Sequence, residues 1–512
     1  MYFMKKRLLI IILAFILTSC MLISCGNKKA DNGKNNDSNI NQTDDNGSAN
    51  ADANATDNQA EKPAEDYIFP DLNCGGEIFT LLNVNTTWDF YTTIVHEAQT
   101  GEILDDAIYK RNLTVEEKFN VKLKETGVLI DQIEAYIKKT VMAGAADYEA
   151  AYCPTYSGAP IGGLITQNLF LDLKEIPELQ LDKPWWNQTV NKECVIGSGE
   201  KLYFTCCDIN IMNLQAPWCV YINEDMIKNL GLDLPYNLVK SGKWTLEKFF
   251  EYAKAGSQLN GEDSFPTTRA KWSPENAAVY GYCSYEGGTR ALVIGTGEKF
   301  ISRDSDGMPY LSIETQRFFD ICDKIVEVTK PDGIYQNAND YDSGGFHFEY
   351  LFRDGKCLMS VAEIKASETF RNMDATFGIV PIPKYDEAQS DYYSSVARQM
   401  PVLVVPNTVA DLQKTGIILD AMAYLSTRDV TPVFFDVTMS QKRLRNEESI
   451  EMLHIIKNSV TYDIGTAYGW TSDIYVSITD ALDKGTNNAV TQIEKQRDKI
   501  ASKIEQTMEL MD

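Results

Sequence analysis

The chain has 512 residues, with 73 acidic against 48 Lys and Arg side chains and a formal net charge of −25 at pH 7. Such a charge argues against nucleic-acid binding, which depends on basic side chains that neutralise phosphates, and against broad contact with anionic lipid headgroups. Hydrophobic residues make up 44% of the chain, which is enough to bury a large core in two or three domains.

The N-terminus has the layout of an export signal. Three basic residues at positions 5–7 precede an apolar run that ends at Ser24 and Cys25. The run is shorter than the roughly 20 residues that a membrane-spanning helix needs. The sequence Leu-Ile-Ser-Cys at 22–25 resembles the lipobox of bacterial lipoproteins, in which the cysteine carries diacylglycerol. We therefore expect a signal peptide over 1–24 and lipidation of Cys25, with Cys20 or an unlipidated export signal as alternatives.

A polar segment follows the signal. Residues 25–66 are rich in Asn, Asp and Ala and poor in apolar side chains, so they cannot bury enough surface to offset the entropy of ordering. The composition predicts a disordered tether over 25–66 and a folded domain over 67–512. With Cys25 lipidated, the domain is expected on the extracellular face of the cell membrane, held through its lipid anchor alone.

The first part of the domain alternates between strand and helix patterns. We expect strands at 77–82, 121–124 and 148–152, separated by helices at 104–119 and 130–142. This alternation is typical of a parallel sheet covered by helices. Ligands of such sheets bind beyond the carboxyl ends of the strands.

Further strands and helices follow with less regular spacing. The expected strands lie at 201–205, 218–222, 357–361, 377–381 and 401–405, with a hairpin formed by 299–301 and 310–313. A helix is predicted at 246–255, and helices dominate from 412 to a last helix at 489–511. The whole domain is therefore predicted to be α/β with a helical C-terminal part.

The cysteines do not indicate a cofactor site. Two of the eleven lie in the signal region, and the other nine show no repeated spacing and no CxxC pair. They are expected to be small buried apolar residues, and no metal or other cofactor is predicted. The acidic turn at 304–307 lacks the position-12 Glu of a calcium loop.

Four short motifs resemble those of extracellular solute-binding proteins. They read WCVYINEDM at 218–226, WTLEKFF at 244–250, FRDGKCLM at 352–359 and FGIVPIPK at 377–384. They occur in the family's order within about 70–510 and are most similar to the sugar-binding type of the maltose-binding-protein class. The chain departs from the family in its cysteines and in residues 261–300, which align with no family segment.

The resemblance implies a periplasmic-binding-protein-like fold of type II. Two interleaved α/β lobes would clamp the ligand in a cleft, with one hinge just before 220–223 and another after the strand at 357–361 or near Val402. The implied role is the monomeric substrate-binding subunit of an ABC importer. Its partners would be a small-molecule solute, expected to be a sugar or oligosaccharide, and the permease transmembrane subunits.

Sugar binding requires apolar ring faces and planar polar groups in loops that follow strands. Six residues fit this description and are the predicted ligand contacts: Trp88, Tyr156, Asp208, Trp272, Glu363 and Trp470. Tryptophan is more often a buried core residue than a ligand contact. Trp185, Trp186 and Trp244 are therefore interpreted as structural.

The sequence offers little support for an enzyme. It has three histidines, and His96-Glu97 lacks the second His of a zinc-protease motif. An acidic chain still offers many carboxylate pairs, so a surface glycosidase or lyase stays open as an alternative. A sensory solute-binding lipoprotein is the other, and the ligand class is also open, because peptides and polyamines bind to similar lobes.

Overall fold

The computed structural model describes residues 67–85, 91–155, 161–266, 276–338, 347–370, 373–397, 399–439 and 447–511. The predicted signal peptide, Cys25 and the tether lie outside the described residues. Within these ranges, none of the helices combines the length and the apolar character that a membrane crossing requires.

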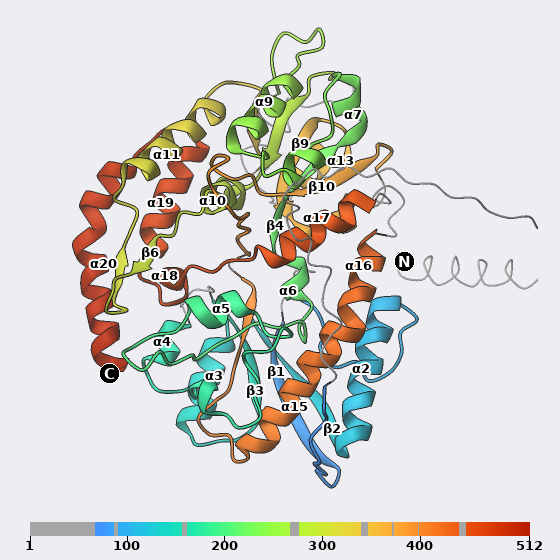
Figure 1. The fold of residues 1–512 in the computed structure, drawn as a ribbon, viewed down its shortest axis with the longest axis vertical. Helices are drawn as coiled ribbons and strands as arrows, with labels where there is room; N and C mark the ends of the chain where they lie inside the picture. Colours follow the sequence, from blue (N-terminus) through green and yellow to red (C-terminus); the bar gives the residue numbers. More distant parts are fainter. Residues whose placement is uncertain are drawn as a thin grey trace, which may run out of the picture. The chain divides into compact units, whose positions relative to one another are not determined.

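The first sheet is the predicted parallel sheet. Its strands run in the order β11-β3-β1-β2, and β1 pairs in parallel with both β2 and β3. The strands are β1 (Glu77–Asn85), β2 (Val121–Leu129), β3 (Ala150–Pro154) and the antiparallel β11 (Pro401–Val404). The helices α2 (Ile103–Phe119) and α3 (Ile133–Met142) connect the parallel strands, as predicted (Figure 1). β3 begins two residues later than expected.

The second sheet contains five strands in the order β10-β4-β9-β5-β8. They are β4 (Trp218–Asn223), β5 (Tyr280–Ser284), β8 (Tyr335–Asn337), β9 (Cys357–Glu363) and β10 (Phe377–Pro381). β9, β5 and β8 are parallel, whereas β4 is antiparallel to both of its neighbours. β5 and the helix α10 (Glu286–Gly295) fall within 261–300, so the segment that aligned with no family motif contributes an interior strand.

Gly281 explains why β5 does not show a strand pattern in the sequence. A Cβ atom at this position would lie 2.0 Å from the carbonyl oxygen of Ala253. Ala253 belongs to α9 (Leu246–Gly256), the helix predicted at 246–255. The close approach of this helix therefore requires a glycine inside the strand.

The strand predicted at 201–205 is wrong. The segment makes only single bridges, one from Lys201 to Ile196 and one from Thr205 to Leu403. The N–H of Leu202 instead donates to Asp172 Oδ1 at 2.9 Å, and the carbonyl of Leu202 accepts from Leu173 N at 2.7 Å. The backbone is thus satisfied by a neighbouring loop rather than by a continuous ladder.

The hairpin and the helical C-terminal part are confirmed. β6 (Ile301–Arg303) and β7 (Pro309–Leu311) form an antiparallel pair. Between them, Asp304 Oδ1 accepts hydrogen bonds from the N–H groups of Asp306 and Met308, both at 2.9 Å, so this carboxylate closes the turn. The helices beyond 412 are α15 (Leu412–Leu425), α16 (Thr431–Met439), α17 (Glu447–Asn458), α18 (Ile464–Ala467), α19 (Ser472–Asp483) and α20 (Ala489–Met511).

Three extended segments lie side by side where the chain passes between the two sheets, and we call them the crossing segments: 216–218, 394–397 and 459–461. Pro217 pairs with Val396, and Ser394 pairs with Val460. The first two crossing segments lie close to the expected hinges before 220 and near Val402. The third was not expected from the sequence.

The nine cysteines after the signal region are all buried, as predicted. Burial raises the pKa of the Cys153 and Cys207 thiols to about 12. These side chains are therefore protonated and behave as small apolar residues at neutral pH.

Candidate functional site

Three of the predicted ligand contacts, Trp88, Tyr156 and Trp272, lie outside the described residues. Their places in the chain are still informative. Trp88 follows β1 by three residues and Tyr156 follows β3 by two, so both come directly after carboxyl ends of parallel strands. Trp272 precedes β5.

Asp208 lies on the wall of a pocket of about 190 Å³, which we call the Asp208 pocket. Its Oδ2 accepts a hydrogen bond from Thr431 Oγ1 at 2.7 Å and lies 3.3 Å from Lys457 Nζ. The other lining residues are Pro184, Trp185, Trp186, Asn187, Gln188, Thr189, Cys207, Asn213, Leu214, Asn458 and Val460. Amide and carboxylate groups therefore gather in this pocket, although protein partners already hold the Asp208 carboxylate.

Trp185 and Trp186 are structural, as predicted. Both are buried, and their indole N–H groups donate to Asp420 Oδ1 at 2.9 and 2.8 Å. Asp420 also accepts from the N–H and side-chain amide of Gln180. One buried carboxylate in α15 thus fixes the segment that forms one wall of the Asp208 pocket.

Glu363 lies at the carboxyl end of β9 and is buried. Its Oε1 accepts a hydrogen bond from the hydroxyl of Tyr285, which follows the parallel strand β5. The Tyr285 ring packs against Trp218 at a centroid distance of 5.1 Å. Glu363 therefore lies at the edge of the second sheet where β9 and β5 end, but it lines neither the Asp208 pocket nor the pocket described next.

Trp470 lies in the core, with 2% of its surface exposed. Its Nε1 donates to Thr507 Oγ1 of α20 at 2.9 Å, and its ring stacks on Tyr468 at 5.1 Å. Because this ring is packed in the protein interior, its position does not support direct ligand contact.

A second pocket joins residues from both sheets and from the crossing segments, and we call it the Arg290 pocket. Its volume is about 50 Å³. Thr155 follows β3 of the first sheet, Arg290 comes from α10 beside the second sheet, and Ser395 belongs to a crossing segment. The remaining lining residues are Cys194, Val396, Thr461, Tyr462, Asp463, Thr466, Ala467 and Tyr475.

Three buried polar atoms of this pocket have no hydrogen-bond partner among the described residues. They are Arg290 Nε, Ser395 Oγ and Asp463 Oδ2. Buried polar groups are normally paired with protein or ordered water, because an unmade hydrogen bond costs free energy. Three such atoms on one pocket indicate a place for a polar ligand or for water. Sequence reasoning did not identify Arg290, Ser395 or Asp463.

Asp463 differs from an ordinary surface carboxylate. Its Oδ1 accepts from the N–H of Gly465 at 2.7 Å, and burial raises its pKa to about 6. The hydrogen bond lowers the pKa, but desolvation is the larger effect.

Beside the Arg290 pocket, contacts link the end of α5 (Gln188–Glu193) to the start of the β6 hairpin. Lys299 Nζ lies 2.5 Å from Glu193 Oε1, and Arg303 Nη2 donates to the Glu193 carbonyl at 2.6 Å. Thr461 Oγ1 donates to Glu193 Oε2 at 3.3 Å. The charges of Lys299 and Glu193 therefore compensate each other near the pocket.

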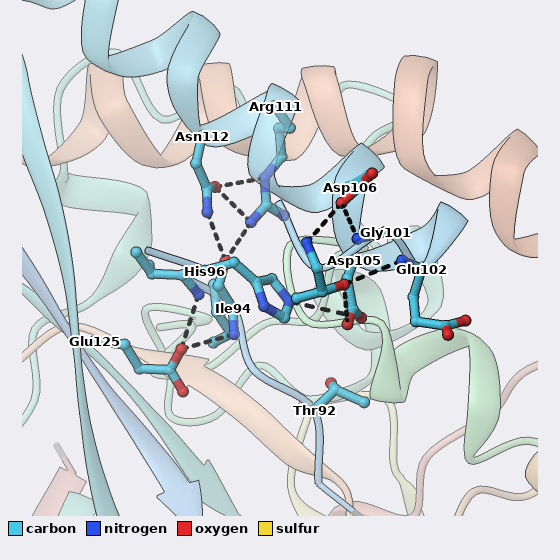
Figure 2. A network of polar contacts seen from close by, with 12 residues as sticks. Thr92, Ile94, His96, Gly101, Glu102, Asp105, Asp106, Arg111, Asn112 and Glu125 are labelled. Carbon is cyan, nitrogen blue, oxygen red and sulfur yellow. Dashed lines mark hydrogen bonds and ion pairs between the residues drawn. The ribbon is translucent and has the colours of Figure 1, made fainter. Parts of the chain in front are cut away.

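A buried network holds the segment that follows β1, shown in Figure 2. Arg111 and Asn112 of α2 both donate to the carbonyl of Ile94, at 2.8 Å each. Glu125 Oε2 accepts from the N–H groups of Ile94 and Val95 at 2.7 and 2.8 Å. This network fixes described residues that follow Trp88 in the sequence.

Asp483 provides a pH-dependent test of the packing of α19. Its Oδ1 accepts from the hydroxyls of Thr289 and Tyr335, and burial raises its pKa to about 7. An unfolded Asp titrates near pH 4, so the folded protein binds more protons between about pH 4 and 7. The free energy of unfolding should therefore fall as pH rises through this window. Asp483→Asn should remove this decrease in the free energy of unfolding. The decrease amounts to about 1.4 kcal/mol for each unit by which the folded and unfolded pKa values differ.

Urea unfolding at pH 5, 6, 7 and 8 measures this effect. Asp473→Asn is the matched control, because Asp473 lies on the same helix and Lys499 holds its pKa below the ordinary value. The control should leave the decrease between pH 5 and 8 in place. An equal decrease in the wild type and in Asp483→Asn would show that Asp483 does not produce it.

Comparison with solved structures reveals the fold. No protein-family model matches the chain, and no curated protein is similar in sequence. An ABC substrate-binding protein from Listeria monocytogenes in complex with cycloalternan superposes with a TM-score of 0.53 at 12% identity, over 84% of this chain and 99% of that one. The chain has the fold of ABC-transporter solute-binding proteins.

Two further structures agree. The GacH receptor of Streptomyces glaucescens, solved unliganded and with acarbose, has a TM-score of 0.50 at 11% identity, over 84% of this chain and 99% of that one. The maltose-binding protein of Listeria monocytogenes in complex with maltose has a TM-score of 0.50 at 12% identity, over 84% and 97%. The predicted α/β periplasmic-binding-protein-like fold is thus confirmed.

Proposed function

We propose that this protein is the solute-binding subunit of an ABC importer and captures a sugar or oligosaccharide outside the cell. One observation carries the proposal: Thr155 after β3, Arg290 of α10 beside the second sheet and residues of two crossing segments meet at the Arg290 pocket, with unpartnered polar atoms. The fold supports the same role, because the three similar structures are described as proteins that bind cycloalternan, acarbose or maltose. The protein would bind and release its ligand without breaking bonds.

The proposed mechanism is closure around the ligand. The crossing segments 216–218, 394–397 and 459–461 would act as hinges, because a few extended residues absorb the change in backbone angles. A ligand that contacts both Thr155 and Arg290 would stabilise the closed state. It can do so only to the extent that it binds that state more tightly than the open one.

The same proposal includes where the protein is held and which subunits it contacts. Signal cleavage before Cys25 and lipidation of its thiol would hold the domain at the extracellular face of the cell membrane. The segment 26–66 would act as the tether, and the closed monomer would dock on the permease transmembrane subunits. Trp88 and Tyr156 remain proposed ligand contacts because each follows a parallel strand of the first sheet.

Thermal unfolding of the purified protein with a panel of neutral oligosaccharides, uronic acids and peptides tests the proposal. A ligand at 100 times its dissociation constant should add about 2.7 kcal/mol to the free energy of unfolding. We expect stabilisation by one class of saccharide and no product after long incubation. Stabilisation by peptides alone would contradict a sugar ligand, and cleavage of the saccharide would indicate an enzyme.

A further inference from the structure

We propose that the Arg290 pocket receives a carboxylate of the ligand, so that the saccharide is acidic and of the uronic-acid class. This inference rests on the proposed function and names the ligand chemistry of the same site. It depends on the side chain of Arg290, on the atoms that surround it and on the size of the pocket.

Arg290 is a buried cation without a bonded counter-charge. It lies in α10 with 7% of its surface exposed. Its guanidinium group lies 4.9 Å from the centre of the Tyr475 ring, and no carboxylate within the described ranges forms a salt bridge with it. Arginine stays charged at all ordinary pH values, and burying an unpaired charge is costly. An anionic ligand would supply the missing partner.

The atoms around Arg290 suit a carboxylate rather than a second cation. Ser395 Oγ is buried and unpartnered, so its hydroxyl can donate to an anion. Asp463 is the acidic group in the lining, and burial raises its pKa to about 6, so its carboxyl can donate to an anion only below about that pH. The nearby Lys299 and Glu193 compensate each other. Asp483 is the other acid near Arg290, and burial raises its pKa to about 7.

The pocket is small, with a volume of about 50 Å³. One water needs about 10–15 Å³ on this measure, so the pocket has room for a carboxylate. The planar guanidinium presents parallel N–H groups that match the two oxygens of a carboxylate. Arg290 would thus select ligands by charge.

Titration calorimetry on the full chain distinguishes the ligand classes. The probes are an oligogalacturonate, a neutral gluco-oligosaccharide of equal length and a sugar phosphate. We expect the oligogalacturonate to bind at least about 10-fold more tightly than the neutral probe, since an ionic hydrogen bond contributes roughly 1.5–3 kcal/mol. Tighter binding of the sugar phosphate would overturn the assignment to a carboxylate.

Arg290→Gln removes the charge and keeps a polar side chain. It should weaken oligogalacturonate binding about 30- to 100-fold, as expected for hydrogen bonds to a charged group. The affinity for the neutral gluco-oligosaccharide should change little. Arg317→Gln is the matched control, because Arg317 is half exposed, pairs with Glu298 and does not line the pocket. Its affinity should equal that of the wild type. If Arg290→Gln fails to fold, Ser395→Ala replaces it, with an expected loss of about 5-fold for one hydrogen bond.

The possible results separate the two proposals. Neutral saccharides that bind more tightly than acidic ones would overturn the carboxylate site and leave the solute-binding role intact. Unchanged oligogalacturonate affinity in Arg290→Gln would do the same, and would indicate that ordered water satisfies the polar atoms of the pocket. Absence of binding to every saccharide probe would instead contradict the proposed function.

Discussion

Replacement of Arg111 by methionine is expected to lower the free energy of unfolding by about 3 kcal/mol or more. Arg111 is almost completely buried and donates to Ile209 O at 2.9 Å, Ser426 Oγ at 3.0 Å and Ile94 O at 2.8 Å. These acceptors belong to three separate segments, and Figure 2 shows the hydrogen bond to Ile94. Methionine fills much of the same space but donates no hydrogen bond. Ile94 O keeps its bond from Asn112, whereas Ile209 O and Asn112 Oδ1 lose the donor that Arg111 supplies, which costs more than the hydrogen bonds contributed.

Urea unfolding at neutral pH measures the loss. Arg497→Met is the control, because Arg497 is half exposed and pairs with Glu314 on the surface. Exposed pairs of this kind contribute about 0–1 kcal/mol. If both variants lose the same small amount, the buried network does not stabilise the first sheet as described.

The second large effect is expected for Asp420→Ala. Its carboxylate accepts from the indole N–H groups of Trp185 and Trp186 and from two donors of Gln180. Alanine leaves these donors buried without an acceptor, at a cost of about 3 kcal/mol or more. The wall of the Asp208 pocket should loosen at the same time.

Urea unfolding combined with tryptophan fluorescence follows both consequences. Asp411→Ala is the matched control on the same helix, since Asp411 caps α15 by accepting from Lys414 N at 2.9 Å. Loss of such a cap costs about 1 kcal/mol. Asp420→Asn keeps an acceptor and should fall between the two. A loss in Asp420→Ala no larger than in the control would rule out the anchoring role.

The parts of the fold that the sequence predicts are those with a local pattern. β1, β2 and the helices between the parallel strands alternate regularly, and their pairing follows from the order of the elements. β5 was missed because contact with α9 requires Gly281 inside the strand. The strand predicted at 201–205 is wrong because the backbone of Leu202 bonds to Asp172 and Leu173 rather than to a continuous ladder, a distinction that depends on tertiary structure.

The candidate site could be predicted only in part from the sequence, because the burial and the partners of its side chains also depend on tertiary structure. Asp208 and Glu363 could be proposed because they follow strand-like segments. Glu363 lies at the carboxyl end of β9, and Asp208 lines a pocket. Trp470 also follows a loop, but its ring is buried against Thr507 and Tyr468. Arg290 lies in an apolar helix and is buried, and within the part of the chain that the structure describes no carboxylate forms a salt bridge with it. That property depends on residues far away in the sequence.

We propose that a saccharide closes the protein about the crossing segments. The most direct test is the distance between a helix on the first sheet and a helix on the second sheet. Spin labels at Met142→Cys of α3 and at Leu230→Cys after α7 (Glu224–Asn229) occupy exposed positions. The nine buried cysteines are protected from labelling. We expect a stabilising saccharide to shorten this distance at saturation. A distance that stays the same when the saccharide is bound would contradict closure.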